Sequence, residues 1–301
     1  MTTHKFGGSW TDEKLDNIRR YLIEYTKIFT NNEAASRFQT IYVDAFAGTG
    51  NRNTPKCNTN ATASMFQDPE FIDQEAEDIR KGSARIALEL NPGFDRYIFI
   101  EKKQGFVHEL EALKVSFPEK AERIRVIQGE ANERLQKWCA STNWKTHRAV
   151  VFLDPYGMEV DWQTITALAE TKAVDLWLLF PLGQAVNRLL TRNGPPDGIW
   201  ADKLTRMFGT PCWREEFYRP RAQMSLFDEN EEETLEKVAD FDKIGNFFVQ
   251  RLKSCFAKVA ENPRPLSNSK NTPIFLLCFA SANPKGAPIA VRIAQYILKM
   301  H

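Results

Sequence analysis

The sequence predicts an α/β fold in which a mostly parallel sheet is covered by helices on both faces. From residue 97 to residue 190, short apolar runs alternate with segments of helical periodicity, an alternation typical of βαβ units. In addition, the apolar run 40–43 leads into an acid and a glycine-rich turn, Asp44-Ala-Phe-Ala-Gly-Thr-Gly50. This second pattern indicates a buried strand whose carboxyl end opens into a nucleotide pocket.

The elements follow one another regularly along the chain. Apolar residues recur at helical spacing from Leu15 to Phe29 and predict a first amphipathic helix, with Thr11 as its N-cap. After residue 44, strands are predicted at 97–100, 124–127, 149–153, 174–180 and 274–279. Helices are predicted at 83–90, 105–115, 131–139, 162–169, 183–190, 241–259 and 289–300, and a loop at 261–273.

The chain of 301 residues is expected to form a single domain with insertions at about 51–81 and 195–240. The first insertion is polar. The second mixes bases with aromatics between Trp200 and Arg221, before an acidic run at 228–236. That mixed stretch either follows a phosphate backbone with its rings stacked on bases or forms helices whose aromatics face the core. We favour the core-facing interpretation.

The composition excludes several classes of protein. A net charge of +1 gives no overall attraction to a polyanion, so a nucleic-acid surface would be a local patch. The five cysteines are scattered without a Cys-x-x-Cys pair, which indicates free thiols in a reducing compartment. No apolar run reaches the roughly 20 residues that span a bilayer, and the four histidines lack metal-ligand spacing. We therefore expect a cytoplasmic protein with neither a membrane partner nor a metal site.

The glycine-rich turn narrows the choice of ligand. A dinucleotide fingerprint would have a third glycine at position 53, where Asn53 stands, so a dinucleotide enzyme is disfavoured. The pattern Asp-x-Phe-x-Gly-x-Gly instead resembles motif I of class I methyltransferases that use S-adenosylmethionine. The resemblance implies that Asp44 holds the amino group of this cofactor and that the pocket floor is formed by Phe46, Ala47, Gly48 and Gly50. Alternatively, the glycines only make a tight turn.

Two further acids follow predicted strands. Glu101 ends the second strand, where a carboxylate accepts hydrogen bonds from ribose hydroxyls; alternatively, it caps a helix beside Lys102 or Lys103. After the third strand, Glu130 is the candidate that faces the adenine amino group, and Gln128 is a weaker one. Glu130 is equally well explained as a residue at the start of the next helix, where the helix dipole favours it.

The fourth strand ends in Asp154-Pro-Tyr-Gly157. With one proline fewer, this resembles motif IV of methyltransferases that modify exocyclic amines of nucleobases, and it is close to the Asp-Pro-Phe-Gly of tRNA guanine-N2 methyltransferases. Asp154 and the carbonyl of Pro155 would accept hydrogen bonds from the amine, while Tyr156 would stack on the base. The alternative is a plain β-turn, since Asp, Pro and Gly are all turn formers.

The wider arrangement resembles the three-Cys-motif partner protein family over most of the chain. The residues that carry this resemblance are Lys14 and Tyr21, the motif at 44–50, Gly82-Ser83, Glu101, the motif at 153–157 and Phe279-Ala-Ser-Ala-Asn-Pro284. The resemblance implies a methyltransferase-like fold and a protein partner with a three-cysteine motif of the kind that can hold an iron–sulfur cluster. Those three cysteines belong to the partner.

Together these patterns predict a Rossmann-like class I methyltransferase fold with S-adenosylmethionine as cofactor. The predicted activity is methylation of an exocyclic amine of a nucleobase in RNA or DNA. The alternative is a non-catalytic binding subunit with the same fold that acts with a partner protein, since the fourth-strand motif has one proline fewer than the consensus and the adenine-facing residue is ambiguous.

Overall fold

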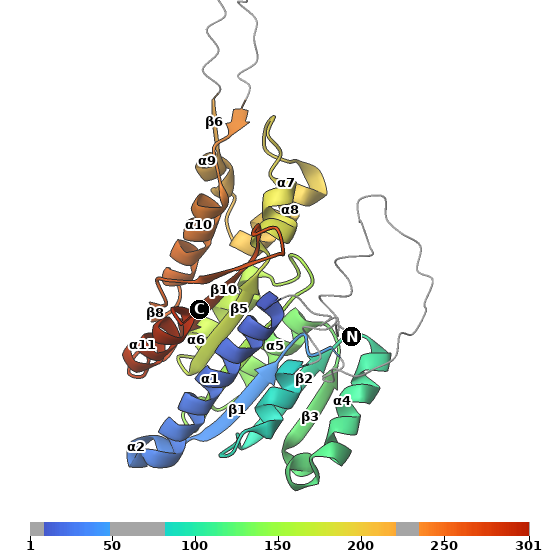
Figure 1. Ribbon diagram of the computed structural model, residues 1–301, viewed down its shortest axis with the longest axis vertical. Coiled ribbons are helices and arrows are strands. Elements are labelled where there is room, and N and C mark those ends of the chain that lie inside the picture. The colour runs from blue at the N-terminus through green and yellow to red at the C-terminus, as the bar shows by residue number, and fades with distance from the viewer. Residues whose placement is uncertain (1–8, 49–81, 221–234, 301) are drawn as a thin grey trace, which may run out of the picture.

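The computed structural model describes residues 9–48, 82–220 and 235–300 (Figure 1). Within these residues, an eight-stranded sheet has the order β3-β2-β1-β4-β5-β10-β8, with β9 paired to β10. Its strands are β1 (Gln39–Asp44), β2 (Arg96–Glu101), β3 (Ile124–Gln128), β4 (His147–Leu153), β5 (Val174–Phe180), β8 (Lys258–Val259), β9 (Arg264–Ser267) and β10 (Pro273–Ser281). The strands from β1 to β5 pair in parallel, whereas β10 runs antiparallel to β5.

The strand order reverses between β1 and β4. β1 pairs in parallel with β2 on one side and with β4 on the other. In open α/β sheets, ligands bind beyond the carboxyl ends of the strands at such a switch point. The sheet confirms the predicted Rossmann-like α/β architecture, mostly parallel and covered by helices, and it locates the place where a ligand is expected.

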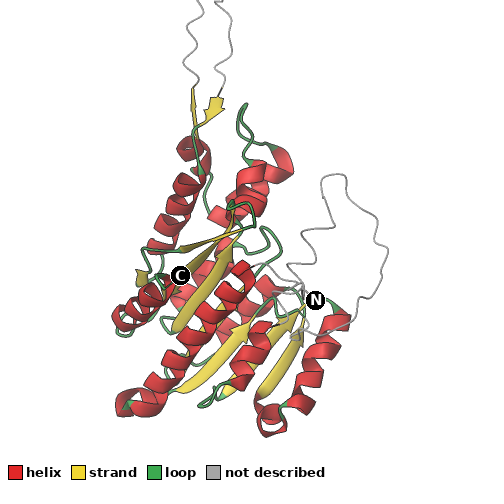
Figure 2. Cartoon of the chain, in the orientation of Figure 1, coloured by secondary structure: helices red, strands yellow, loops and turns green. Residues whose placement is uncertain are grey.

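Helices cover both faces of the sheet (Figures 1 and 2). One face packs against α1 (Ser9–Asn31), the helical segment 82–89, α4 (Gln104–Ser116) and α11 (Ala287–Leu298). The other packs against α5 (Ala131–Ser141), α6 (Trp162–Glu170) and α10 (Phe241–Lys253). The alternation of strand side chains divides the core, since Val43 contributes to one cluster and its neighbour Tyr42 to the other. None of the helices in the described ranges is both long enough and apolar enough to cross a membrane.

Between β5 and α10 the chain leaves the sheet and extends away from it, at the top of Figure 1. This segment contains η2 (Leu182–Val186), α7 (Asn187–Leu189), α8 (Gly198–Phe208), α9 (Trp213–Phe217) and the hairpin β6 (Tyr218–Pro220) with β7 (Leu235–Lys237). The side chains of Trp213 and Phe217 are fully buried, which confirms the core-facing interpretation for these two aromatics, whereas Trp200 is 45% exposed.

Three local predictions are wrong. α1 begins at Ser9, so Thr11 lies inside the helix and is not its N-cap. β9 lies in the predicted loop 261–273, and the predicted helix 241–259 ends at Lys253, with β8 near its expected end. β8 and β9 both pair with β10, and such long-range pairing overrides the local pattern from which the helix and loop were predicted. Two shorter elements, α2 (Glu33–Ser36) and η1 (Pro118–Arg123), were not predicted.

The predicted division of the chain into one domain with two insertions stays a prediction. The insertion at 51–81 lies outside the described residues, as do residues 221–234 of the insertion at 195–240.

Candidate functional site

Three of the predicted acids lie at the carboxyl ends of neighbouring strands. Asp44 ends β1, Glu101 ends β2 and Asp154 directly follows β4. Their residues are 0%, 7% and 6% exposed. Because Asp44 pairs with Phe152 in the β1–β4 register, Asp154 stands only two residues beyond that pair. The fold therefore gathers at one edge the acids that the sequence places far apart.

Asp44 is an acid in an apolar interior. The hydroxyl of Ser83, from the helical segment 82–89, donates to Oδ2, and the N–H of Phe46 donates to Oδ1 at 3.3 Å. Burial raises the pKa of Asp44 to about 7, and the nearby Asp154 also raises it, although the Ser83 hydrogen bond acts in the opposite direction. Asp44 thus titrates near neutral pH, and an arriving cation would favour its charged form.

The floor of the predicted pocket follows Asp44 directly. Phe46 is half-buried, while Ala47 and Gly48 are buried. Gly48 has φ +58°, in the left-handed region that favours glycine, so the turn needs this residue. Gly50 lies outside the described residues.

Glu101, at the end of β2, holds this turn through hydrogen bonds. Its Oε2 accepts a hydrogen bond from the N–H of Gly48 at 3.0 Å, and its Oε1 accepts from the N–H groups of Lys102 and Lys103 at 2.9 and 2.8 Å. A carboxylate has about four acceptor directions, so three backbone donors leave about one. A ribose held through both hydroxyls would need one of these N–H groups to give way.

Asp154 forms a buried ion pair with a residue of the first helix. The Nζ of Lys14 donates to Oδ2 of Asp154 at 2.7 Å, and the Lys14 side chain is 0% exposed. The same Nζ lies 5.6 Å from the centroid of the Phe152 ring. Strand alternation explains the contact, because Phe152 and Asp154 are two residues apart and face the side of the sheet that α1 covers. No local pattern predicted this pair, since the partners are 140 residues apart.

The residues after Asp154 lie beside the end of β2. Pro155 is buried and Tyr156 is half-buried. The Nζ of Lys103 lies 5.7 Å from the centroid of the Tyr156 ring, a cation–π contact. Gly157 has φ +63°, so the turn beyond the aromatic also requires glycine. The contact links the predicted cofactor side of the edge to the predicted acceptor side.

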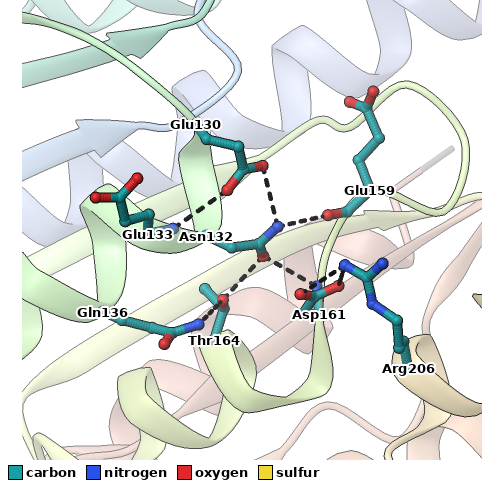
Figure 3. Close-up of polar contacts among 8 residues, drawn as sticks. All are labelled: Glu130, Asn132, Glu133, Gln136, Glu159, Asp161, Thr164 and Arg206. Carbon is teal, nitrogen blue, oxygen red and sulfur yellow. Dashed lines mark hydrogen bonds and ion pairs between the residues drawn. The ribbon is translucent and has the colours of Figure 1, made fainter.

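Glu130 is the N-cap of α5. Its carboxylate accepts a hydrogen bond from the N–H of Glu133 at 3.2 Å and another from Asn132 Nδ2 at 3.2 Å (Figure 3). Glu130 is exposed. The side chain therefore caps the helix, as one of the two interpretations held, and its contact with adenine stays a prediction. Gln128 ends β3 and is exposed as well.

Asn132, which the sequence analysis missed, holds the loop that follows Asp154 (Figure 3). Its Nδ2 donates to the carbonyl of Glu159 at 2.8 Å, and its Oδ1 accepts from the N–H of Asp161 at 3.0 Å and the hydroxyl of Thr164 at 2.8 Å. Asn132 is 7% exposed. A single amide thus joins the start of α5 to the loop between β4 and α6.

We expect Asn132→Leu to lower the free energy of unfolding by about 2–4 kcal/mol, since it leaves buried partners of the amide without hydrogen bonds. Urea denaturation measures this loss. Arg206→Gln is the control, because Arg206 also contacts this loop, through an ion pair with Asp161, but its side chain is 64% exposed. An exposed ion pair contributes about 0–1 kcal/mol to the free energy of unfolding. Equal losses in the two variants would contradict a special role for Asn132.

A groove between α1 and α11 lies apart from this edge. It is lined by Arg20, Ile23, Glu24, Arg292, Ile293, Tyr296, Ile297 and Met300. On α1 these residues begin six positions after Lys14, about 9 Å along the helix axis. The groove is therefore not part of the candidate site.

No family model and no curated protein matches the chain, so the resemblance to the three-Cys-motif partner family stays a prediction. Among solved structures, protein LPL1258 of Legionella pneumophila is 10% identical, with 97% of this chain and 92% of that chain covered and a TM-score of 0.47. Spermidine synthase of Thermotoga maritima is 11% identical, with 94% and 61% covered and a TM-score of 0.38. A putative methyltransferase of Escherichia coli, yhhF, is 16% identical, with 55% and 67% covered and a TM-score of 0.26. Likenesses this weak carry no argument about activity.

Proposed function

We propose that the protein is an S-adenosylmethionine-dependent methyltransferase that methylates an exocyclic amine of a nucleobase in RNA or DNA. The observation that supports this most directly is the position of two buried acids at the switch point. Asp44 ends β1, and Asp154 follows the adjacent strand β4. A cofactor held by the first acid lies next to an acceptor held by the second.

The residues at this edge suit such a cofactor better than a phosphate-bearing one. Carboxylates at Asp44, Glu101 and Glu130 attract an amino group, accept hydrogen bonds from hydroxyls and repel a pyrophosphate. We assign Asp44 to the amino group, Glu101 to the ribose and Glu130 to the adenine. The floor of the pocket is assigned to Phe46, Ala47, Gly48 and Gly50. The cofactor supplies an activated methyl group on a sulfonium centre.

Asp154, Pro155 and Tyr156 form the acceptor side of the proposed site. Lys14 binds Oδ2 of Asp154, so Oδ1 is the oxygen that receives a hydrogen bond from the acceptor amine. The carbonyl of Pro155 receives the second one, which turns the nitrogen lone pair towards the methyl group. Tyr156 stacks on the base. As the N–C bond forms and the C–S bond breaks, the surplus proton on nitrogen leaves to solvent, so the protein needs no strong base.

The test combines cofactor binding with methyl transfer. We expect titration calorimetry to detect S-adenosylmethionine binding, and labelled cofactor to transfer its methyl group to cellular RNA or DNA. Asp154→Asn is expected to keep binding and to lower transfer by about 10²–10³-fold, since it removes a charge placed against the reacting amine.

Each part of the proposal has its own contradicting outcome. A wild-type protein that binds no S-adenosylmethionine would overturn the cofactor assignment. Binding without labelling of any cellular fraction would favour the non-catalytic binding subunit. An Asp154→Asn variant that loses cofactor binding as well would show that the acceptor role of Asp154 is wrong.

A further inference from the structure

Among the residues that the structure describes, the candidate site holds three buried acids, Asp44, Glu101 and Asp154, and one buried lysine, Lys14. Asp44 is 0% exposed, Asp154 is 6% exposed and Lys14 is 0% exposed. Lys14 touches Asp154, at 2.7 Å, and acts on Asp44 only through the longer-range field. An opposite charge within contact distance favours the charged form of an acid, and a nearby like charge disfavours it. Lys14 therefore interacts more strongly with Asp154 than with Asp44.

Within the described ranges, the other groups that act on Asp44 do not supply a second positive charge. Ser83 of the segment 82–89 and the N–H of Phe46 give it hydrogen bonds. Tyr42 of β1 is an acid that burial keeps neutral, since its pKa lies well above the usual 10. Glu101 of β2 turns its oxygens towards backbone N–H groups. Among the described residues that act on Asp44, Lys14 is accordingly the cation, and its direct contact is with Asp154.

We propose that Lys14 is a positioning residue of the acceptor site, which orients Asp154 through their ion pair and so leaves Asp44 as the acid that gives up its proton when the cofactor's amino group binds. This inference rests on the proposed function, since it takes the ligand of Asp44 to be S-adenosylmethionine. It assigns the two acids different tasks. Asp154 accepts hydrogen bonds, while Asp44 is partly protonated near pH 7 when the protein is empty and charged when the cofactor is bound.

The proposal predicts how many protons cofactor binding releases. An acid with a pKa of about 7 is about half protonated at pH 7 and about one-tenth protonated at pH 8. Binding to wild-type protein should then release about half a proton from Asp44 at pH 7 and about a tenth at pH 8. Calorimetric titration with S-adenosylmethionine in two buffers of different ionisation enthalpy counts these protons without knowledge of the acceptor.

Lys14→Met is the decisive variant. Without the lysine, no positive charge at Asp154 offsets the repulsion that Asp154 exerts on the charged form of Asp44, so Asp44 keeps its proton to higher pH. We expect binding at pH 8 to release more protons from the variant than from wild type. The amino group of the cofactor titrates in this range too, but it contributes equally to both titrations and cancels in the difference.

Two more variants complete the experiment. Lys27→Met makes the same change in the same helix at a side chain that is 51% exposed, and its proton count should equal that of wild type. Asp154→Asn removes the repelling acid and leaves the lysine near Asp44, so the release at pH 7 should fall below about half a proton. If Lys14→Met does not fold, as judged by circular dichroism, the proton count of Asp154→Asn tests the inference instead.

The outcomes separate the two proposals. If Lys14→Met binds the cofactor and releases as many protons as wild type, Lys14 does not set the charges of this site and the inference is wrong. The same conclusion follows if Asp154→Asn leaves the count at pH 7 unchanged. If wild-type protein binds no S-adenosylmethionine at all, the proposed function itself has failed.

Discussion

Asp44→Asn is expected to stabilise the empty protein at pH 8 while it weakens cofactor binding by about tenfold or more, or roughly 1.4 kcal/mol. Asp44 is fully buried, and burial raises its pKa from 3.8 to about 7. Because the folded-state pKa is the higher one, the stability that this carboxyl contributes is fully present below about pH 4. This stabilisation is lost as the pH rises through about 7, and at higher pH the lost stability stays constant. Asparagine has a similar shape and no charge to bury.

Urea denaturation at pH 5 and pH 8 measures this effect. At about 1.4 kcal/mol per unit, the stability difference between Asp44→Asn and wild type should grow by about 2–3 kcal/mol between these two pH values. Asp202→Asn, a change at an exposed aspartate, controls for the loss of one negative charge. Curves for wild type and Asp44→Asn that stay parallel across this range would contradict the raised pKa of Asp44.

Asp154→Ala is expected to destabilise the protein more than removal of the whole ion pair does. The single change takes the Asp154 carboxylate away from the ammonium of Lys14, which is 0% exposed, and removal of one member of a buried ion pair costs about 3–5 kcal/mol. The double variant Lys14→Met with Asp154→Leu removes both charges, and apolar replacements of this kind are often neutral or stabilising. A double-mutant cycle in urea, with Lys14→Met and Asp154→Leu as its single variants, measures the coupling, and Asp154→Ala is compared with the double variant in the same experiment.

Additive losses in this cycle would show that the two side chains do not depend on each other. The prediction also bears on how the acceptor role is tested. An alanine at position 154 would lower methyl transfer through partial unfolding alone, whereas Asp154→Asn keeps an oxygen next to Lys14. For this reason the asparagine variant, which the proposed function expects to keep its cofactor binding, is the informative one for catalysis.

The sequence predicted the fold from features that are local along the chain. Apolar runs alternating with helical periodicity suffice for a parallel sheet, because βαβ units follow from that alternation. The three acids of the edge were also predictable, since Asp44, Glu101 and Asp154 each follow an apolar run, and the carboxyl ends of parallel strands lie at one edge. Glu130 shows the limit of this reasoning, because the same position also begins a helix and its carboxylate caps it.

Other parts of the site depend on contacts between distant segments. Nothing in the sequence near Lys14 indicates that its ammonium lies on Asp154, or that Ser83 donates to Asp44 across a separation of 39 residues. The sequence around Asn132 does not indicate that its side chain binds Asp161. Likewise, β9 is recognisable only through its pairing with β10. In each case the packing of distant segments brings the two partners together.

By itself, then, the sequence determined the α/β class, the order of its main strands and helices, and which acids end the strands, since these follow from periodicity and from where apolar runs stop. Only the tertiary structure decided which groups surround those acids. Burial and the distance to a counter-ion set the pKa of a carboxyl, and both are properties of the packed chain. That is why Asp44, with its raised pKa, and Asp154, paired with Lys14, differ although their sequence contexts are alike.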